Sequence, residues 1–311
     1  MKKRMVGLLL AMVMCVTLCV PSFAISAEDS EIDESGFSVS EYEMVLNAQQ
    51  DWIAAQGIQV QSENAESTPA PLEEFQKSFD ARAKLPTDVL KGYGYSDEKI
   101  SILKQYEKGE IPFEVAAMSA SARLVGNIYC GTHMATKYSL TYEWEWDVLP
   151  NGLGRDGFGL GLQGIDNQSD GFNTKIDSSA ASVTYYYMTG TRYRAENVSK
   201  SPNTNTISAT FDSYKLTDSG DRWVWAKSGY LTMTISPTVS GGKQFAAVRA
   251  RGEYSHSSND KIDLNLAISV DVISGNITFA ASISNGKSGN IQQCGIRQIV
   301  FYNDGSYHEE V

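Results

Sequence analysis

The sequence lacks the motifs of a nucleotide-binding loop, a zinc site and an activated catalytic nucleophile. Its three histidines are isolated, and none has a second ligand residue at the spacing that metal coordination requires. No apolar run beyond residue 20 has the roughly 20 residues that a membrane-spanning helix needs. No internal repeat indicates a solenoid or a propeller. These absences argue against a nucleotide-dependent enzyme, a zinc protein and a repeat protein.

The chain is also short of positive charge, with 26 Lys and Arg against 37 Asp and Glu and a net charge of -11. The deficit is concentrated in residues 25 to 121, which have 7 basic and 19 acidic residues, whereas residues 122 to 311 have 16 and 18. Nucleic acid binding needs a basic face that displaces counterions, and neither region has one. We therefore expect no nucleic acid partner, and two regions of different character.

Residues 1 to 24 have the pattern of a secretory signal peptide. A short basic head is followed by an almost wholly apolar run from residue 5 to residue 20. Ser22 and Ala24 then place small residues at the positions that precede a cleavage site after Ala24. We therefore expect an exported, secreted or extracellular protein with no stable membrane span after signal removal.

Cysteine is scarce, because two of the four cysteines, Cys15 and Cys19, lie within this leader. The other two, Cys130 and Cys294, predict one disulfide bond in an oxidising compartment. That bond would close most of the second region into one loop and stabilise the fold by up to about 5 kcal/mol. The alternative is a nucleophilic cysteine beside His133, although no catalytic signature surrounds either thiol.

Residues 25 to 121 are predicted to be an acidic segment of helices and linker that acts as a spacer or a propeptide. Residues 42 to 56 place apolar side chains near one helical face, with Ser40 as the N-cap. Residues 72 to 108 contain three further helical stretches, and the third begins at Ser96.

From Leu124 onward the apolar period changes to two, which is the period of a β-strand. Residues 138 to 148 and residues 264 to 272 alternate in this way over their whole length. Eight further candidate strands are residues 157–165, 181–189, 206–216, 222–226, 230–236, 244–255, 275–284 and 291–302. Turns rich in glycine, asparagine and aspartate separate them. The pattern predicts an antiparallel β-sandwich or jelly-roll-like domain over residues 122 to 311.

One segment has part of the spacing of a calcium-binding loop. Its candidate ligands are Asp166, Gln168, Asp170 and Asp177, and Gly171 stands where such a loop turns sharply. Gln168 replaces an aspartate or asparagine, Asp177 is shorter than the usual glutamate, and the flanks have strand periodicity. A Ca²⁺ site and a plain connection between strands therefore remain as alternatives.

Two glutamates, Glu143 and Glu145, share one face of a predicted strand at a separation of about 6.6 Å. Paired carboxylates roughly 5 to 10 Å apart cleave glycosidic bonds, so a partner such as Glu253 would complete a glycoside hydrolase site. An acidic face in contact with solvent explains the same pattern.

Aromatic residues are abundant in the second region, and seven are candidates for a contact surface. They are Trp144, Trp146, Tyr185, Tyr186, Tyr187, Trp223 and Trp225. Each Trp pair lies on one face of a strand, and that face either fills the core between two sheets or forms an exposed platform for sugar rings. In three consecutive tyrosines of a regular strand, at least one ring must point away from the core.

The sequence thus predicts a secreted, non-enzymatic protein that binds an extracellular glycan or a cell-surface protein through its β domain. One alternative is a glycoside hydrolase on a jelly-roll scaffold. Another is a β-hairpin pore-forming protein, because strands that alternate apolar and hydroxyl side chains, as residues 231 to 236 do, also line toxin pores.

Overall fold

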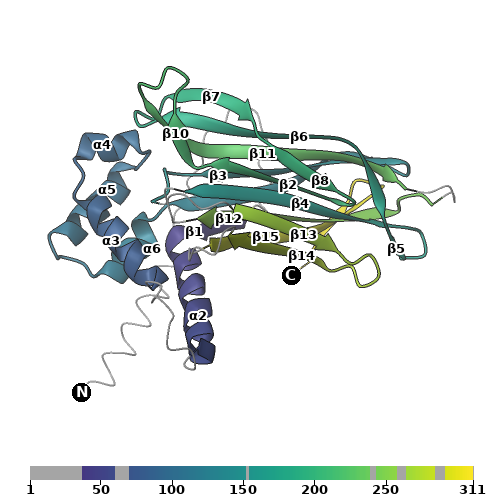
Figure 1. Cartoon of the computed structure of the whole chain (residues 1–311), viewed down its shortest axis with the longest axis horizontal. Helices are drawn as coiled ribbons and strands as arrows, with labels where there is room; N and C mark the ends of the chain where they lie inside the picture. Colours follow the sequence, from purple (N-terminus) through teal and green to yellow (C-terminus); the bar gives the residue numbers. More distant parts are fainter. Residues whose placement is uncertain are drawn as a thin grey trace. The chain divides into compact units, whose positions relative to one another are not determined.

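Most of the strands predicted beyond Leu124 form two antiparallel sheets that pack against each other, with helices at one end (Figure 1). This confirms the predicted β-sandwich. The computed structural model describes residues 37–59, 70–151, 154–238, 243–257, 264–283 and 291–310, all within the unit Ser35–Val311. The predicted signal peptide lies outside these residues. Within them, no helix is both long enough and apolar enough to span a bilayer.

Sheet A has the strand order β1-β2-β3-β11-β6-β7, and β10 pairs with β11 beyond this path. Its strands are β1 (Phe37–Ser40), β2 (Arg123–Met134), β3 (Lys137–Trp146), β6 (Thr174–Tyr187), β7 (Arg192–Asn197), β10 (Tyr214–Leu216) and β11 (Trp223–Pro237). The sequence predicts two strands where β11 is one. A shift in register between Ala226 and Ser228 lets β11 continue through the segment that was expected to separate them.

Sheet B has the order β16-β15-β12-β4-β9-β8, with β5 paired to β4. Its strands are β4 (Arg155–Ile165), β5 (Gly171–Phe172), β8 (Lys200–Asn203), β9 (Thr206–Asp212), β12 (Ala247–Ser257), β15 (Ile291–Tyr302) and β16 (Tyr307–Glu310). The outermost strands of both sheets are short and polar. They lack the alternating pattern from which a strand is recognised, which is why the sequence did not predict them.

A two-stranded hairpin, β13 (Leu264–Val270) and β14 (Ile277–Ile283), forms a third layer on the outer face of sheet B. It lies there because β4 has glycine at every outward position from Gly157 to Gly161. A Cβ atom at Gly159 would come within 2.3 Å of Ile268 Cδ1. The glycines therefore leave room for the hairpin, which Figure 1 shows on the side of sheet B away from β6 and β11.

The helices are α2 (Glu41–Gln59), α3 (Pro71–Ala83), α4 (Thr87–Gly92), α5 (Asp97–Glu107) and α6 (Phe113–Ala120). The first four confirm the predicted helical stretches, whereas the sequence did not predict α6. Ser40 Oγ accepts a hydrogen bond from the Glu43 backbone at 3.0 Å, and Glu43 Oε2 accepts one from the Ser40 backbone at 3.1 Å. This capping box begins α2. Ser96 Oγ caps α5 by accepting from the Lys99 backbone at 3.2 Å.

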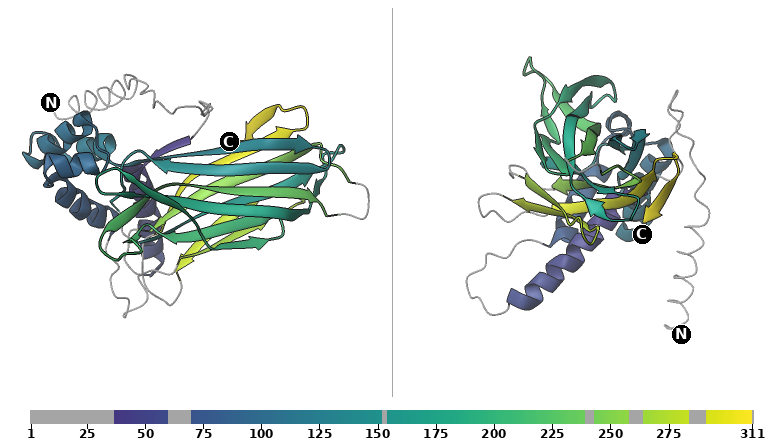
Figure 2. Two further views of the ribbon diagram at one scale, coloured as in Figure 1. Left: turned by 90° about the horizontal axis from the view of Figure 1, so that it is seen from above. Right: turned by 90° about the vertical axis from the view of Figure 1, so that its right-hand side faces the viewer.

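Helices α3 to α6 lie at one end of the sheets (Figure 2), and one hydrophobic core joins the helices to the sheets. Phe79 and Leu103 belong to it from the helices, and Trp144 and Phe158 from sheets A and B. In addition, β1 precedes the helices and pairs with β2. Residues 37–59 and 70–121 are therefore integral to the described fold, whereas the role of the region 25 to 121 as spacer or propeptide remains a prediction.

Candidate binding surface on the outer face of sheet A

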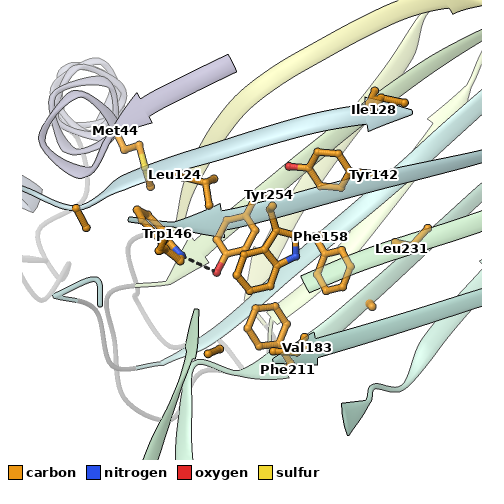
Figure 3. Packing of buried hydrophobic residues seen from close by; sticks show 14 of the residues in the cluster. Met44, Leu124, Ile128, Tyr142, Trp146, Phe158, Val183, Phe211, Leu231 and Tyr254 are labelled. Atoms are coloured by element: carbon orange, nitrogen blue, oxygen red, sulfur yellow. Dashed lines mark hydrogen bonds between the residues drawn. The ribbon is translucent and has the colours of Figure 1, made fainter. Parts of the chain in front are cut away.

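Four of the seven predicted contact aromatics are buried, which corrects their assignment to a surface. Trp144 and Trp146 are 2% and 0% exposed, because β3 turns its apolar side chains toward sheet B. Tyr185 also points inward, and its hydroxyl donates to the Asp212 carbonyl of sheet B at 3.0 Å. Large rings fill the space between the two sheets (Figure 3), which is the core alternative for this face.

Trp225, the fourth buried aromatic, is covered from the outside. It follows the inward-facing Val224 along β11, and the ring of Tyr93 packs against it at right angles with centroids 6.2 Å apart. The Arg82 guanidinium in turn lies 4.4 Å from the Tyr93 ring centroid. The helical region therefore covers part of the outer face of sheet A, and this removes Trp225 from contact with a ligand.

Three aromatic residues and one leucine around Trp225 on this face are wholly or partly exposed, and we call them the aromatic patch. Trp223 is 48% exposed, and its ring lies 5.0 Å from that of Tyr214 on β10. Leu216, 43% exposed, is the register partner of Trp223. Tyr186 on β6 is half-buried and pairs with Trp225. The patch consists of Tyr186, Tyr214, Leu216 and Trp223.

Tyr187 lies outside the patch, at the end of β6. It is half-buried, and its ring packs on that of Tyr193 with centroids 5.4 Å apart. Arg222 lies over the Tyr187 ring at 5.8 Å, and Arg194 over the Tyr193 ring at 4.9 Å. Of the three consecutive tyrosines, the first is therefore in the core, and the other two are within reach of solvent.

The predicted acidic pair lies on the same outer face as the patch. Glu143 and Glu145 are both exposed on β3, and Lys227 Nζ lies 3.6 Å from Glu145 Oε1. The same ammonium group lies 5.5 Å from the centroid of the Tyr186 ring, so it connects the acids to the patch. Partial desolvation and the nearby Glu145 carboxylate raise the pKa of Glu143.

Glu253 does not converge with these two acids. Its neighbours Gly252 and Tyr254 face Tyr142 and Trp144 in the core, so Glu253 points to the opposite, outer side of sheet B. Both sheets therefore separate it from Glu143. Glu253 is 1% exposed, and burial raises its pKa to about 7, although Arg251 NH2 at 3.7 Å acts in the opposite direction. The predicted three-carboxylate site is not present.

Two of the four candidate calcium ligands, Asp166 and Asp177, have side chains engaged in other contacts. Asp166 Oδ1 accepts hydrogen bonds from the Gln168 and Asp170 backbones, both at 3.0 Å, and its Oδ2 lies 3.0 Å from Lys243 Nζ. Asp177 lies in β6 and accepts from Ser236 at 3.0 Å. In the part of the chain that the structure describes, no three His, Cys, Asp or Glu side chains gather as metal ligands. Residues 166 to 170 connect β4 to β5, whereas Asp177 lies beyond β5 in β6.

The predicted disulfide bond is not found. Cys130 is a free cysteine whose thiol donates to the Thr132 carbonyl at 3.3 Å, whereas Cys294 belongs to β15 with a side chain outside the described residues. Burial raises the pKa of the Cys130 thiol to about 11, so almost none of it is thiolate at neutral pH. This also argues against the alternative of a nucleophilic cysteine beside His133.

The strand that suggested a pore-forming hairpin is central in sheet A. Residues 231 to 236 lie in β11, which is paired with β3 on one side and with β6 on the other. Leu231, Met233 and Ile235 are fully buried, and Thr232 Oγ1 lies 2.9 Å from Thr141 Oγ1 on the outer face. This strand therefore has no free edge with which to enter a membrane.

The structure also joins residues that the sequence gave no reason to connect. His256 Nδ1 lies 3.0 Å from Asp156 Oδ1, and the Tyr254 hydroxyl donates to Asp156 Oδ2 at 2.6 Å. The same hydroxyl accepts a hydrogen bond from Trp146 Nε1 at 3.3 Å (Figure 3). All four side chains are buried. Burial opposes protonation of His256, but the Asp156 carboxylate outweighs it and raises the pKa.

Glu41, the first residue of α2, extends this buried network toward the helices. Its carboxylate accepts from the backbone and side chain of Asn151 at 2.6 and 3.0 Å. Burial raises the pKa of Glu41, and the positive charges of His256 and Arg82 oppose that increase. With both His256 and Glu41 enclosed, the network holds the helices to the sandwich and offers no surface to a ligand.

Comparison with known proteins adds little to this description. No family model and no curated protein matches the sequence. A solved structure of AvmM, which catalyses macrocyclization in alchivemycin A biosynthesis, is 10% identical with a TM-score of 0.22, over 53% of this chain and 90% of that one. A structure concerned with pH-induced modulation of Streptococcus parasanguinis adhesion by Fap1 fimbriae is 11% identical with a TM-score of 0.20, over 56% and 78%. Neither likeness is close enough to support an argument.

Proposed function

We propose that this protein is an extracellular binding protein that holds a glycan on the outer face of sheet A. The observation that carries the proposal is the exposure of Trp223, whose indole lies beside the Tyr214 ring on the outer face of sheet A. An exposed indole with aromatic neighbours is a flat apolar platform that suits the C–H face of a sugar ring.

Polar groups beside the patch suit the hydroxyl groups of a sugar. Glu143, Glu145 and Lys227 supply acceptors and donors on the same face, and Tyr230, 40% exposed, is the register partner of Glu143. The face therefore combines a stacking surface with hydrogen-bonding groups of both kinds, which is the composition of a carbohydrate site.

A glycan array, followed by calorimetry on the best ligand, tests this function. We expect Trp223→Ala to weaken binding by about 2 kcal/mol, or roughly 30-fold, because an exposed aromatic anchor carries much of the energy of such a contact. Trp223→Phe should retain most of the affinity. Ile273→Ala is the matched control, since Ile273 is 94% exposed but lies in the turn between β13 and β14.

Binding to whole cells, after treatment of the cells with protease or periodate, distinguishes a glycan from a protein partner. Binding that survives protease treatment of the cells but is lost after periodate oxidation supports a glycan. If protease treatment of the cells abolishes binding, the partner of the aromatic patch is a cell-surface protein instead. Retention on no glycan and no cell, or equal binding by wild type and Trp223→Ala, would contradict the proposal.

The extracellular location is part of the proposal, and it depends on the leader sequence. We propose that residues 1 to 24 direct export and are then removed, because their basic head, apolar run and small residues have the pattern of a signal peptide. Mass spectrometry of protein from the culture medium tests this. A mature chain that begins at Ile25 supports it, whereas intact protein recovered only from the cytoplasm contradicts it.

A further inference from the structure

A strip of the outer face of sheet A leads from the aromatic patch to the centre of the sheet, and we call it the polar track. The track consists of Thr141, Glu143, Glu145, Lys227, Tyr230 and Thr232. It begins beside the patch, where Lys227 Nζ lies 5.5 Å from the centroid of the Tyr186 ring and 3.6 Å from Glu145 Oε1. Glu143 is the next outward residue of β3, and its register partner on β11 is Tyr230. The track is therefore continuous with the patch.

A β-bulge in β11 places Tyr230 on this face. Ala226 points into the core and is 3% exposed, and Gly229 points there too, since a Cβ atom on it would come within 2.7 Å of Trp144 Cζ2. Two residues lie between them instead of the single residue of a regular strand, so the alternation shifts by one position. An uninterrupted alternation from the outward Trp223 would turn Tyr230 into the core. With the bulge, Tyr230 is outward and 40% exposed.

The side chains around Tyr230 are small, and several have hydroxyl groups. On β6 its register partner is Ser182, and the next outward position, opposite Thr232, is Ala180. On β3, Thr141 Oγ1 lies 2.9 Å from Thr232 Oγ1. One exposed aromatic ring among small polar side chains is a second place where a sugar ring can stack and form hydrogen bonds.

The length and the charge of the track restrict what it can hold. From Tyr186 to Ala180, β6 advances six residues, or about 20 Å, which is longer than one sugar ring. Lys227 is beside the Glu145 carboxylate, whereas Glu143 has no ion pair among the described residues. An acidic polymer would bring like charge to Glu143 and be repelled, but the hydroxyl groups of a neutral sugar can donate hydrogen bonds to this carboxylate.

We infer that the ligand is a neutral, linear polysaccharide chain that lies along the polar track, with one sugar on the aromatic patch and another on Tyr230. This inference rests on the proposed function and adds the length, the charge and the direction of the bound glycan. A single terminal sugar would occupy the patch alone and leave the track uncovered.

Calorimetry on the mature chain tests the inference with disaccharides and hexasaccharides of glucose, xylose, mannose and galacturonic acid. We expect one of the neutral hexasaccharides to bind at least about tenfold more tightly than its disaccharide, because only the longer chain reaches both rings. Tyr230→Ala should remove most of that gain, so that both ligands bind with similar affinity, whereas Trp223→Ala should weaken both. Tyr302→Ala is the matched control, since Tyr302 is also 40% exposed but lies on β15 of sheet B.

The charge of the track is tested separately. Glu143→Gln removes the carboxylate that repels acidic polymers, so the galacturonic acid hexasaccharide should bind roughly tenfold more tightly to this variant than to wild type. Glu98→Gln, at an exposed carboxylate on α5, is the control and should not change the affinity for this ligand.

The outcomes distinguish this inference from the proposed function. The inference is overturned if wild type binds both lengths equally, if it binds no neutral hexasaccharide, or if Tyr230→Ala and Tyr302→Ala have equal effects. Tighter binding of the acidic hexasaccharide than of every neutral one would overturn it as well. The proposed function survives each of these results if Trp223→Ala still weakens binding on the glycan array, and it fails if Trp223→Ala does not.

Discussion

Replacing Glu253 with glutamine should change how the stability of this protein depends on pH. The Glu253 carboxyl is 1% exposed on the side of sheet B that faces the hairpin, and its Oε1 has no hydrogen-bond partner among the described residues. The nearest cation, Arg251, lies 3.7 Å away, which does not offset the cost of desolvation, and the pKa rises to about 7. Glutamine has nearly the same shape as glutamic acid but does not ionise, so its burial does not depend on pH.

The size of the effect follows from the two pKa values. Between pH 4.5 and about 7, the folded protein retains a proton that the unfolded chain releases, so the stabilisation is complete below pH 4.5 and is lost as the pH rises through about 7. The difference corresponds to about 3 kcal/mol. Wild type should therefore lose about 3 kcal/mol more than Glu253→Gln between pH 4.5 and pH 8, which is roughly 5 to 10 °C in Tm.

Thermal and urea unfolding of both proteins at a series of pH values measures this difference. Glu41 and His256 also have raised pKa values, so some loss of stability with rising pH should remain in Glu253→Gln. Glu98→Gln, at an exposed carboxylate in the first turn of α5, is the control and should follow wild type. Identical pH profiles for wild type and Glu253→Gln would refute the reasoning.

Three other substitutions test the fold. Trp144→Ala should lower the free energy of unfolding, measured in urea, by about 3 to 5 kcal/mol, because it leaves a cavity among three aromatic rings. A decrease below about 1 kcal/mol would mean that the surrounding side chains fill this cavity. Gly159→Val should displace the hairpin and remove its protection in hydrogen exchange, whereas Gly131→Ala, with no atom nearer than 3.9 Å, should not. Ser40→Ala should destabilise the protein by about 1 kcal/mol through the loss of the α2 cap, and unchanged stability would argue against the capping box.

Local pattern was a sound guide where one segment determines its own structure. The alternation along β3 predicted a strand with one apolar face, and Ser40 and Ser96 marked the helix starts at which they act as caps. The local pattern did not predict short strands such as β8 and β16. It also predicted two strands where β11 is one, because a bulge at Ser228 interrupts the alternation without ending the strand. In such segments too few residues repeat to distinguish a strand from a loop.

The candidate site required information that no single segment contains. Trp223 and Trp225 stand two apart on one face of β11, but Tyr93 from the helices covers only Trp225. Likewise, the sequence allows the carboxyl groups of Glu143 and Glu253 to lie close together, but Glu143 is on the outer face of sheet A and Glu253 on the outer face of sheet B. Which side chain meets solvent depends on contacts between residues more than a hundred positions apart.

By itself, the sequence determined the class of the fold and its longer helices and strands, because side-chain period and end-capping are properties of neighbouring residues. Only the tertiary structure decided which faces are covered: the docking of the hairpin on the β4 glycines, the pairing of His256 with Asp156, and the exposure of the aromatic patch. Burial depends on what packs against a face, and packing partners are set by long-range topology rather than by local pattern.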